Sequence, residues 1–181
     1  AIRLLTDSSV AGNQQRLAGL ALGSLSNEVV GSLVQQAAVE HHGLVLTYLA
    51  SAMRLMNPND RWTMACQLAK HGEFKDDRVY PYLVWYGLEP SVSTHSTRIQ
   101  EWFSVSKLPI VDQFVARRLA IEYTFRRDAL LGLVGMLQNE QVPTEQKDAV
   151  LQGLADGWNG WSDLPKPDGW SEVAVHSARD P

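Results

Sequence analysis

The sequence predicts an all-α protein: a right-handed superhelical stack of antiparallel helix pairs, that is, a HEAT-like α-solenoid. Apolar residues recur at helical spacing, and no window shows the strict alternation of a strand. The expected helices, about 10 to 15 residues long, are joined by short loops, which favours antiparallel hairpins. Pairs beginning near Gly43, Val79 and Pro109 recur roughly every 30 to 36 residues, close to the spacing of α-solenoid repeats. An irregular helical bundle is the alternative.

The first part of the chain is expected to contain three well-marked helices. Before them, residues 1–5 read as the end of a helix and residues 15–25 are ambiguous. Asn27 is expected to cap the first of the three, residues 57–59 (NPN) to break the second, and Gly72 to end the third. The helices run from Asn27 to about Glu40, from Gly43 to Met56, and from Asn59 or Asp60 to the residue before Gly72.

The most unusual stretch is YPYLVWYGLEP (80–90), which is apolar or aromatic at almost every position. Pro81 suits the start of a helix, where its missing N–H costs nothing. Pro90 disfavours helical angles in the residue before it, so we expect the helix to end there. A helix that is apolar on all sides packs on several sides. We therefore expect it in the middle of the module, with Trp85 buried and with Gly87 allowing another helix to approach closely.

Four further helices are expected after this stretch, and each carries an apolar stripe at helical spacing. They run from about Thr97 to Ser106, from Pro109 onward, from Arg126 to Asn139, and from Thr144 to near Gly157. A loop rich in Trp, Pro and Gly follows over residues 158–170. Because loose linkers rarely carry tryptophan, we expect Trp158, Trp161 and Trp170 to pack back on the last helices.

Composition narrows the class of protein. The net charge of −4 and the pI of about 5.7 argue against a dedicated nucleic-acid binder, which normally has a basic face. The single cysteine, Cys66, excludes an internal disulfide. No apolar run has the length of a membrane span. Residues 1–181 are expected to form one module, and because the chain begins in the middle of a helix, we expect that module to be a fragment of a larger protein.

Several segments, taken in order, resemble the helical region of the PVC-type haem-binding-domain proteins, a group also described as membrane-bound dehydrogenases. The resemblance covers most of the chain from Gly43 onward. The segments that carry it are LVWYGLEP (83–90), SKLPIV (106–111), VARRLA (115–120) and PDGW (167–170), together with AIRLL (1–5) and YLASA (48–52).

The resemblance implies a large exported or periplasmic protein. In that family an N-terminal β-propeller similar to sugar dehydrogenases is followed by a HEAT-like region and a C-terminal cytochrome-c-type domain. The haem domain needs Cys-x-x-Cys-His, whereas this chain has one cysteine. The chain therefore corresponds to the HEAT-like region, with no cofactor of its own. The c-type haem and any dehydrogenase activity would lie elsewhere in the parent.

No catalytic motif is recognisable, and we predict no catalytic residue. A metal site is not expected either, because no histidine lies at helical spacing from Cys66 or from a second histidine on a helix. We expect His71, near a helix C-terminus, to interact with the helix dipole. The acidic loop with Glu73, Asp76 and Asp77 is expected to be solvated.

One possible binding site is predicted on the central helix. Trp85, Tyr86 and Glu89 could line a pocket, since Trp85 and Glu89 share a helix face. In the alternative interpretation the aromatic rings belong to the core and Glu89 pairs with Arg117 or Arg118, because a buried carboxylate needs such a partner. Arg117 and Arg118 could also bind phosphates or carboxylates, although ordinary ion pairing is the simpler expectation.

The leading hypothesis for function is therefore a non-enzymatic helical-repeat scaffold or protein-interaction module. Its expected partners are neighbouring domains of the parent protein or another protein, with no nucleic acid and no membrane span. Two alternatives remain open. One is a HEAT-like DNA-binding protein or DNA-glycosylase-type enzyme, which would need a basic concave face. The other is a small-ligand pocket near Trp85.

Overall fold

The computed structural model describes residues 25–122, 127–161, 168–171 and 173. In these residues every regular element is helical: there are eight α-helices, three short 3-10 helices and no strand. The all-α prediction is therefore confirmed for the described part of the chain. The predicted helix end at residues 1–5 and most of the ambiguous segment 15–25 lie outside it.

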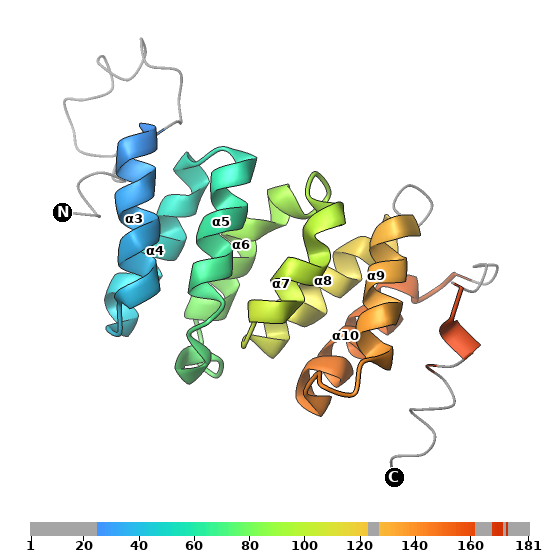
Figure 1. The fold of residues 1–181 in the computed structure, drawn as a ribbon. Helices are drawn as coiled ribbons and strands as arrows, with labels where there is room; N and C mark the ends of the chain where they lie inside the picture. The colour runs from blue at the N-terminus through green and yellow to red at the C-terminus, as the bar shows by residue number, and fades with distance from the viewer. Residues whose placement is uncertain (1–24, 123–126, 162–167, 172, 174–181) are drawn as a thin grey trace. The chain divides into compact units, whose positions relative to one another are not determined.

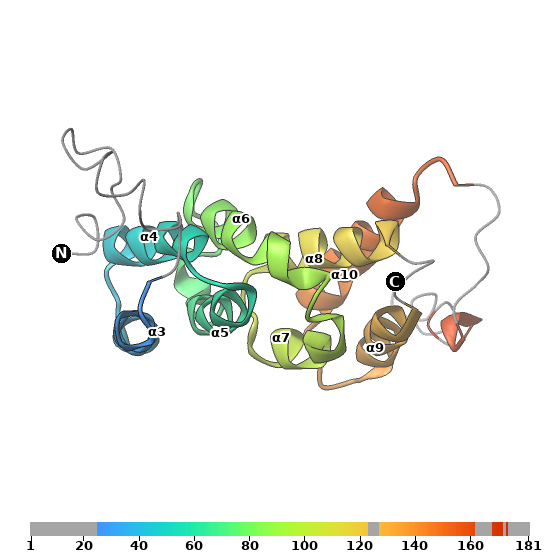
Figure 2. The same ribbon diagram turned by 90° about the horizontal axis from the view of Figure 1, so that it is seen from above.

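The chain divides into two compact units, residues 1–91 and 92–181. In the first unit α3 packs against α5 and α4, and α4 packs against α5. Figures 1 and 2 show α3 and α5 side by side in one row, with α4 and α6 in a second row. The helices of this unit are α3 (Asn27–Val39), α4 (Gly43–Ala52), η1 (Met53–Leu55), α5 (Pro58–Leu68), η2 (Gly72–Phe74) and α6 (Tyr80–Val92).

The second unit repeats this arrangement. Here α7 packs against α9, and α8 packs along α10; in Figure 2 the two pairs form separate rows. Whether the two units together form the single module predicted from the sequence stays a prediction. The elements of this unit are η3 (Ser96–Arg98), α7 (Ile99–Val105), α8 (Pro109–Ile121), α9 (Arg127–Gln138) and α10 (Thr144–Trp158).

The N-caps of α3 and α5 lie one to three residues earlier than predicted, whereas α4 begins at Gly43 as predicted. Ser26, not Asn27, is the N-cap of α3, and its side chain accepts a hydrogen bond from the backbone N–H of Val29. Asn57 caps α5 by accepting from the N–H of Asp60. Pro58 then occupies the first turn of the helix, where a proline is tolerated.

Helix α6 differs from its prediction at both its end and its surface. It continues through Pro90 to Val92. A proline inside a helix cannot donate a hydrogen bond to the carbonyl four residues earlier. Here that carbonyl belongs to Tyr86, and because Tyr86 and Pro90 are both exposed, water can bind it instead. The helix buries one face only, and Tyr82 and Tyr86 lie on its exposed side. Trp85, predicted to be buried, is half-buried.

The start of α6 is fixed by hydrogen bonds to two preceding residues, Asp77 and Leu68. Asp77, predicted to be simply solvated, accepts hydrogen bonds at 2.8 Å from the N–H groups of Val79 and Tyr80. These bonds lower the pKa of the Asp77 carboxyl. The buried hydroxyl of Tyr80 donates to the carbonyl of Leu68 at 2.7 Å, which joins α6 to the end of α5.

In the second unit, α8 and α10 approach closely along a glycine–alanine contact formed by Gly153 and Gly157 of α10 and Ala116 and Ala120 of α8. A Cβ at Gly153 would lie 2.9 Å from the Cβ of Ala116 and would overlap the carbonyl oxygen of Gln113. A Cβ at Gly157 would lie 2.5 Å from that of Ala120. Gly157 is buried in the last turn of α10, which ends one residue later at Trp158, so the predicted helix end near Gly157 is confirmed.

The segment after α10 returns to the end of the second unit, as predicted for two of its three tryptophans. The rings of Trp158 and Trp170 meet edge to face with centroids 5.6 Å apart. Gln138 of α9 donates to the carbonyl of Gly169 at 3.2 Å. Trp161, in contrast, is 51% exposed, so its predicted packing was wrong. Residues 162–167 of the predicted loop lie outside the described residues.

No helix in the described ranges has the length and apolar character that a membrane span requires.

The glycine–alanine contact predicts a large cost for a single methyl group. Gly153→Ala should lower the free energy of unfolding by roughly 1–3 kcal/mol, because the added Cβ forces α8 and α10 apart. Gly135→Ala is the matched control: it lies inside α9 with nothing within 4 Å of the added Cβ, so it should stabilise by about 0.5–1 kcal/mol. Urea denaturation of both variants tests this, and a Gly153→Ala protein as stable as the wild type would contradict the close approach.

The two tail tryptophans provide a second comparison. Trp170→Ala should cost roughly 1–2 kcal/mol, because it removes the edge-to-face pair with Trp158. Trp161→Ala removes an exposed ring and should change stability by less than about 0.5 kcal/mol. Thermal melting followed by circular dichroism measures both effects. Equal melting temperatures for the two variants would show that the pair of rings does not hold the tail.

Candidate functional site

A buried carboxylate forms the centre of a polar cluster in the second unit. Asp112, in the first turn of α8, is only 1% exposed. Its Oδ1 accepts a hydrogen bond from Nε1 of Trp102 at 2.8 Å, and its Oδ2 accepts one from Nε2 of Gln146 at 3.0 Å. The side chain of Ser106 is also hydrogen-bonded to the carboxyl. We call these four residues the Asp112 network.

The amide of Gln146 extends the network to the backbone of α7. Its Nε2 donates to the carbonyl of Phe103 at 3.2 Å and lies 3.4 Å from that of Ser106. A helix leaves its last carbonyls without partners inside the helix, and Phe103 is in the last turn of α7. The network therefore joins α7, α8 and α10 and also satisfies the C-terminal end of α7.

The environment of Asp112 changes its acidity. Burial raises the pKa of its carboxyl to about 7, and the hydrogen bonds from Ser106, Gln146 and Trp102 oppose this increase. A carboxyl with such a pKa occurs both in catalytic sites and in structural networks. At Asp112 both oxygens already accept bonds from side chains of the same unit, and the group is almost fully buried. The geometry thus favours a structural role over general acid–base chemistry.

The sequence analysis did not identify Asp112. An aspartate in the first turn of a helix is common, because it interacts favourably with the helix dipole there. Its burial depends on Gln146, 34 residues later in the chain. A possible signal was the spacing of Trp102 and Asp112 around Pro109, but this spacing does not by itself predict a hydrogen bond.

The predicted site on α6 coincides in part with a hollow in the first unit. Tyr86, 64% exposed, lines a cavity of about 260 Å³. Trp85 and Glu89, the other two predicted residues, are half-buried on the same helix. We call this cavity the α6 hollow. Its lining residues are Ala50, Ser51, Arg54, Leu83, Tyr86 and Gly87.

The predicted basic pair makes local contacts in the second unit. Arg118 forms an ion pair with Glu122, with Nη2 and Oε1 2.9 Å apart, as expected for ordinary pairing. Arg117 is exposed, and its charge is one of the causes that lower the pKa of Asp156, after hydrogen bonds from Gln113 and Gln152. Glu89 belongs to the other unit, so its pairing with an arginine stays a prediction.

A second cavity of about the same size, 290 Å³, lies between α7 and α9. Its lining carries no charged group. The cavity is lined by apolar, small and amide-bearing residues: Gln100, Phe103, Ser104, Gly132, Gly135, Met136, Asn139 and Val142. This cavity can accept a surface of another molecule, but no residue of its lining is an acid or a base at neutral pH.

His71 makes two contacts that were not predicted. His71 is buried, and its Nε2 lies 2.8 Å from the carbonyl oxygen of Ala37 in the last turn of α3. Its Nδ1 is 3.3 Å from Oε1 of Glu73. It therefore joins η2 to α3, and its predicted interaction with a helix dipole stays a prediction. Within the described residues, no group of three or more His, Cys, Asp or Glu residues could hold a metal ion.

No family model, no curated protein and no solved structure matches this chain. The resemblance of its sequence to the PVC-type haem-binding-domain proteins thus stays a prediction.

Asp112 predicts a specific pH dependence of stability. Its folded-state pKa of about 7 lies above the ordinary value of 3.8. Between these values the native state binds more protons than the unfolded state, so the contribution of Asp112 to stability is greatest below about pH 4 and is lost as the pH rises to about 7. At about 1.4 kcal/mol for each pKa unit, the free energy of unfolding decreases by roughly 4 kcal/mol over this range.

The test is to subtract the unfolding free energy of Asp112→Asn from that of the wild type at several pH values. This difference should decrease as the pH rises from about 4 to about 8, because the variant lacks the titrating group. Asp156→Asn is the matched control. The pKa of Asp156 is lowered, so its contribution is instead lost as the pH falls. A difference for Asp112→Asn that is independent of pH would contradict the raised pKa.

Proposed function

We propose that this chain is a non-enzymatic helical-repeat scaffold that holds a neighbouring domain or a partner protein. The packing within each unit supports a HEAT-like stack, because the helices alternate between two rows in chain order: α3 and α5 opposite α4 and α6, and α7 and α9 opposite α8 and α10. Successive antiparallel pairs added in this way produce an α-solenoid.

The observation that carries the proposal is an exposed apolar face on α6. Val79, the residue before the helix, and Tyr82 and Tyr86 within it follow helical spacing and are 52%, 40% and 64% exposed. We call this set the α6 face. Tyrosine is enriched at protein interfaces, because its ring supplies contact area and its hydroxyl tolerates water. An apolar face that the rest of the unit does not cover is characteristic of an interaction surface.

The buried polar chemistry supports the same proposal. Burial raises the pKa of Asp112, a described residue, to about 7, and the carboxyl is enclosed by Trp102 and Gln146. A catalytic carboxyl must reach a substrate atom within hydrogen-bond distance. The Asp112 network instead uses its hydrogen bonds to join three helices. A scaffold needs such rigid connections between helices.

The sequence resemblance places the scaffold in a wider context. In a parent of the PVC-type haem-binding kind, this chain would be the helical region that links a β-propeller to a cytochrome-c-type domain in an exported or periplasmic protein. Haem binding and any dehydrogenase activity would then belong to the other domains. The net charge of −4 makes the alternative, a HEAT-like DNA-binding protein or DNA glycosylase, the weaker candidate.

Site-specific photo-crosslinking in the protein's own host tests the scaffold function. Tyr82→p-benzoylphenylalanine places the reactive group on the α6 face, and Lys70→p-benzoylphenylalanine places it on an exposed residue after α5. We expect position 82 to give a discrete adduct, to another protein or to a flanking domain of the same polypeptide, at least about tenfold more abundant than any adduct at position 70.

Two outcomes would contradict the proposal. One is equal, weak crosslinking at both positions. The other is sub-micromolar binding of duplex DNA that weakens steeply with salt, which would favour the DNA-binding alternative.

A further inference from the structure

The cavity of 290 Å³ in the second unit is formed by one face of α7 and one face of α9, and we call it the α7–α9 cavity. Gln100, Phe103 and Ser104 are spaced by three and four positions on α7, so they share one face of that helix. The lining residues between positions 132 and 139 follow the same spacing along α9 and its C-terminal end. The two helices pack against each other and lie side by side in Figure 2. The cavity is therefore a space between two opposed helix faces.

Two glycines of α9 keep this space open. A Cβ at Gly132 would lie 3.2 Å from Cγ2 of Ile99, so this glycine also permits close packing against α7. A Cβ at Gly135 would meet nothing within 4 Å in the described part of the unit. A side chain at position 135 can therefore occupy the cavity without forcing the two helices apart.

The polar groups of the lining are uncharged, and their own hydrogen bonds decide what they can offer to a ligand. Asn139 Oδ1 accepts a hydrogen bond from the backbone N–H of Gln141 at 2.9 Å, which leaves the N–H groups of its Nδ2 as donors. Ser104 Oγ donates its proton to the carbonyl of Glu101 at 2.7 Å, so toward a ligand it can only accept. A matching ligand needs one acceptor and one donor. The backbone of a peptide provides both, as C=O and N–H.

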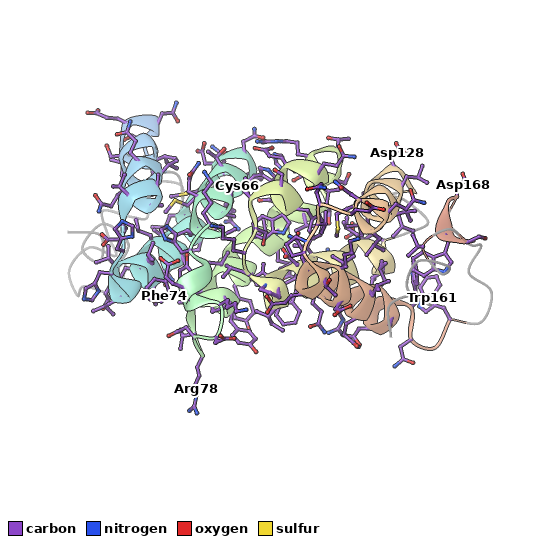
Figure 3. All side chains as sticks on the ribbon, turned by 60° about the horizontal axis from the view of Figure 1, so that its bottom comes forward. Cys66, Phe74, Arg78, Asp128, Trp161 and Asp168 are labelled. Carbon is purple, nitrogen blue, oxygen red and sulfur yellow. The ribbon has the colours of Figure 1, made fainter. Side chains whose placement is uncertain are left out.

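The other side chains of the lining favour an uncharged, apolar group. Phe103 and Met136 are buried and supply apolar surface. Asp128, in the first turn of α9, is outside the lining, and Figure 3 shows its side chain at the surface of the unit. A charged group in the cavity would lose its hydration without an opposite charge to offset that cost. The volume lies just below the range of about 300–1,000 Å³ typical of sites that enclose a whole small molecule, so the cavity suits one side chain of a larger ligand.

We propose that the α7–α9 cavity binds one apolar residue of an extended, uncharged segment of a partner protein. The side chain packs against Phe103 and Met136, a backbone carbonyl accepts from Asn139, and a backbone N–H donates to Ser104. The segment is extended because a helix would use these backbone groups for its own hydrogen bonds. Recognition in which main-chain bonds supply affinity and a pocket supplies specificity is established for extended peptides. This inference rests on the proposed scaffold function and specifies the chemistry of one partner segment.

The probe is the capped tripeptide N-acetyl-Ala-Leu-Ala-amide, which has an apolar central side chain and no charge. One matched control has alanine in the centre and loses most of the apolar contact, and the other has aspartate in the centre and gains a charge. Binding to the full chain is followed by chemical-shift changes of backbone amides in the second unit. We expect the leucine peptide to bind with a millimolar Kd, as is usual for a small flexible ligand. Each control should bind at least about tenfold more weakly.

A cavity-filling variant tests the location of the site. Gly135→Leu should weaken binding of the leucine peptide at least about tenfold, because its side chain occupies the cavity. It should not lower the melting temperature, since leucine is a better helix former than glycine. Gly31→Leu is the matched control, because Gly31 lies inside α3 of the first unit and an added Cβ there also meets nothing within 4 Å in the described residues. It should leave the affinity unchanged.

A second variant tests the hydrogen bond from Asn139. Asn139→Asp keeps an acceptor for the N–H of Gln141 but removes the donor, so it should weaken binding of the leucine peptide about three- to tenfold. Asn27→Asp is the matched control, because Asn27 is exposed and belongs to α3 of the first unit. It should leave the affinity unchanged.

The inference is overturned if the three peptides bind equally well, or if the leucine peptide does not bind at about 20 mM, well above the expected Kd. It is also overturned if either variant binds this peptide as well as its matched control does. Crosslinking at position 82 takes place in the first unit and does not depend on these results. A crosslink there without peptide binding in the α7–α9 cavity would reject the extended segment and retain the scaffold. Loss of the crosslink would reject the scaffold itself.

Discussion

The last carbonyls of a helix have no partners within that helix, and burying them unsatisfied is costly. In both units this constraint is met by a buried polar side chain from a later element. His71 lies 2.8 Å from the carbonyl of Ala37 in α3, Tyr80 donates to that of Leu68 in α5, and Gln146 donates to that of Phe103 in α7. Each contact satisfies a helix end and also joins it to the next part of the unit. The positions of neighbouring helices therefore depend on these three side chains.

In the second unit the glycine–alanine contact makes the hydrogen bond from Gln146 to the carbonyl of Phe103 possible. Asp112 and Ala116 are four residues apart on α8, and Gln146 and Gly153 are seven apart on α10, so each pair lies on one face of its helix. Because Gly153 lets the backbones meet, the amide of Gln146 can reach both the Asp112 carboxylate and α7. At the other end Gln113 donates to Asp156 at 2.9 Å. Tight packing between these polar contacts keeps water away from Asp112, which raises its pKa.

Local patterns in the sequence were sufficient to predict the helices, because apolar spacing and turn residues act over a few positions. Features that depend on distant residues were missed or misinterpreted. Gly157 marks the end of α10 to within one residue, as predicted, but its close contact with Ala120 was not predicted. Pro90 normally ends a helix, yet its exposure at the end of α6 makes the lost hydrogen bond tolerable. Tyr86 does line a hollow, although its role in binding stays a prediction, whereas Arg54 and Ser51, which line the same hollow, lie on another helix pair and carry no local signal.

The same physical reasoning separates the structural residues from those available for binding. A side chain that holds two helices together, such as Tyr80 or Gln146, is buried and already has its partners, so it is not available to another molecule. On α6 the division falls within one helix: Tyr80 and Leu88 face inward, while Tyr82 and Tyr86 face outward. Because the buried face and the contact of Gly87 with Met53 fix the orientation of the helix, the exposed tyrosines are held in place before any partner arrives. Such preorganisation reduces the entropy lost on association, so a rigid helix gives these side chains an advantage as a binding surface that a flexible loop would lack.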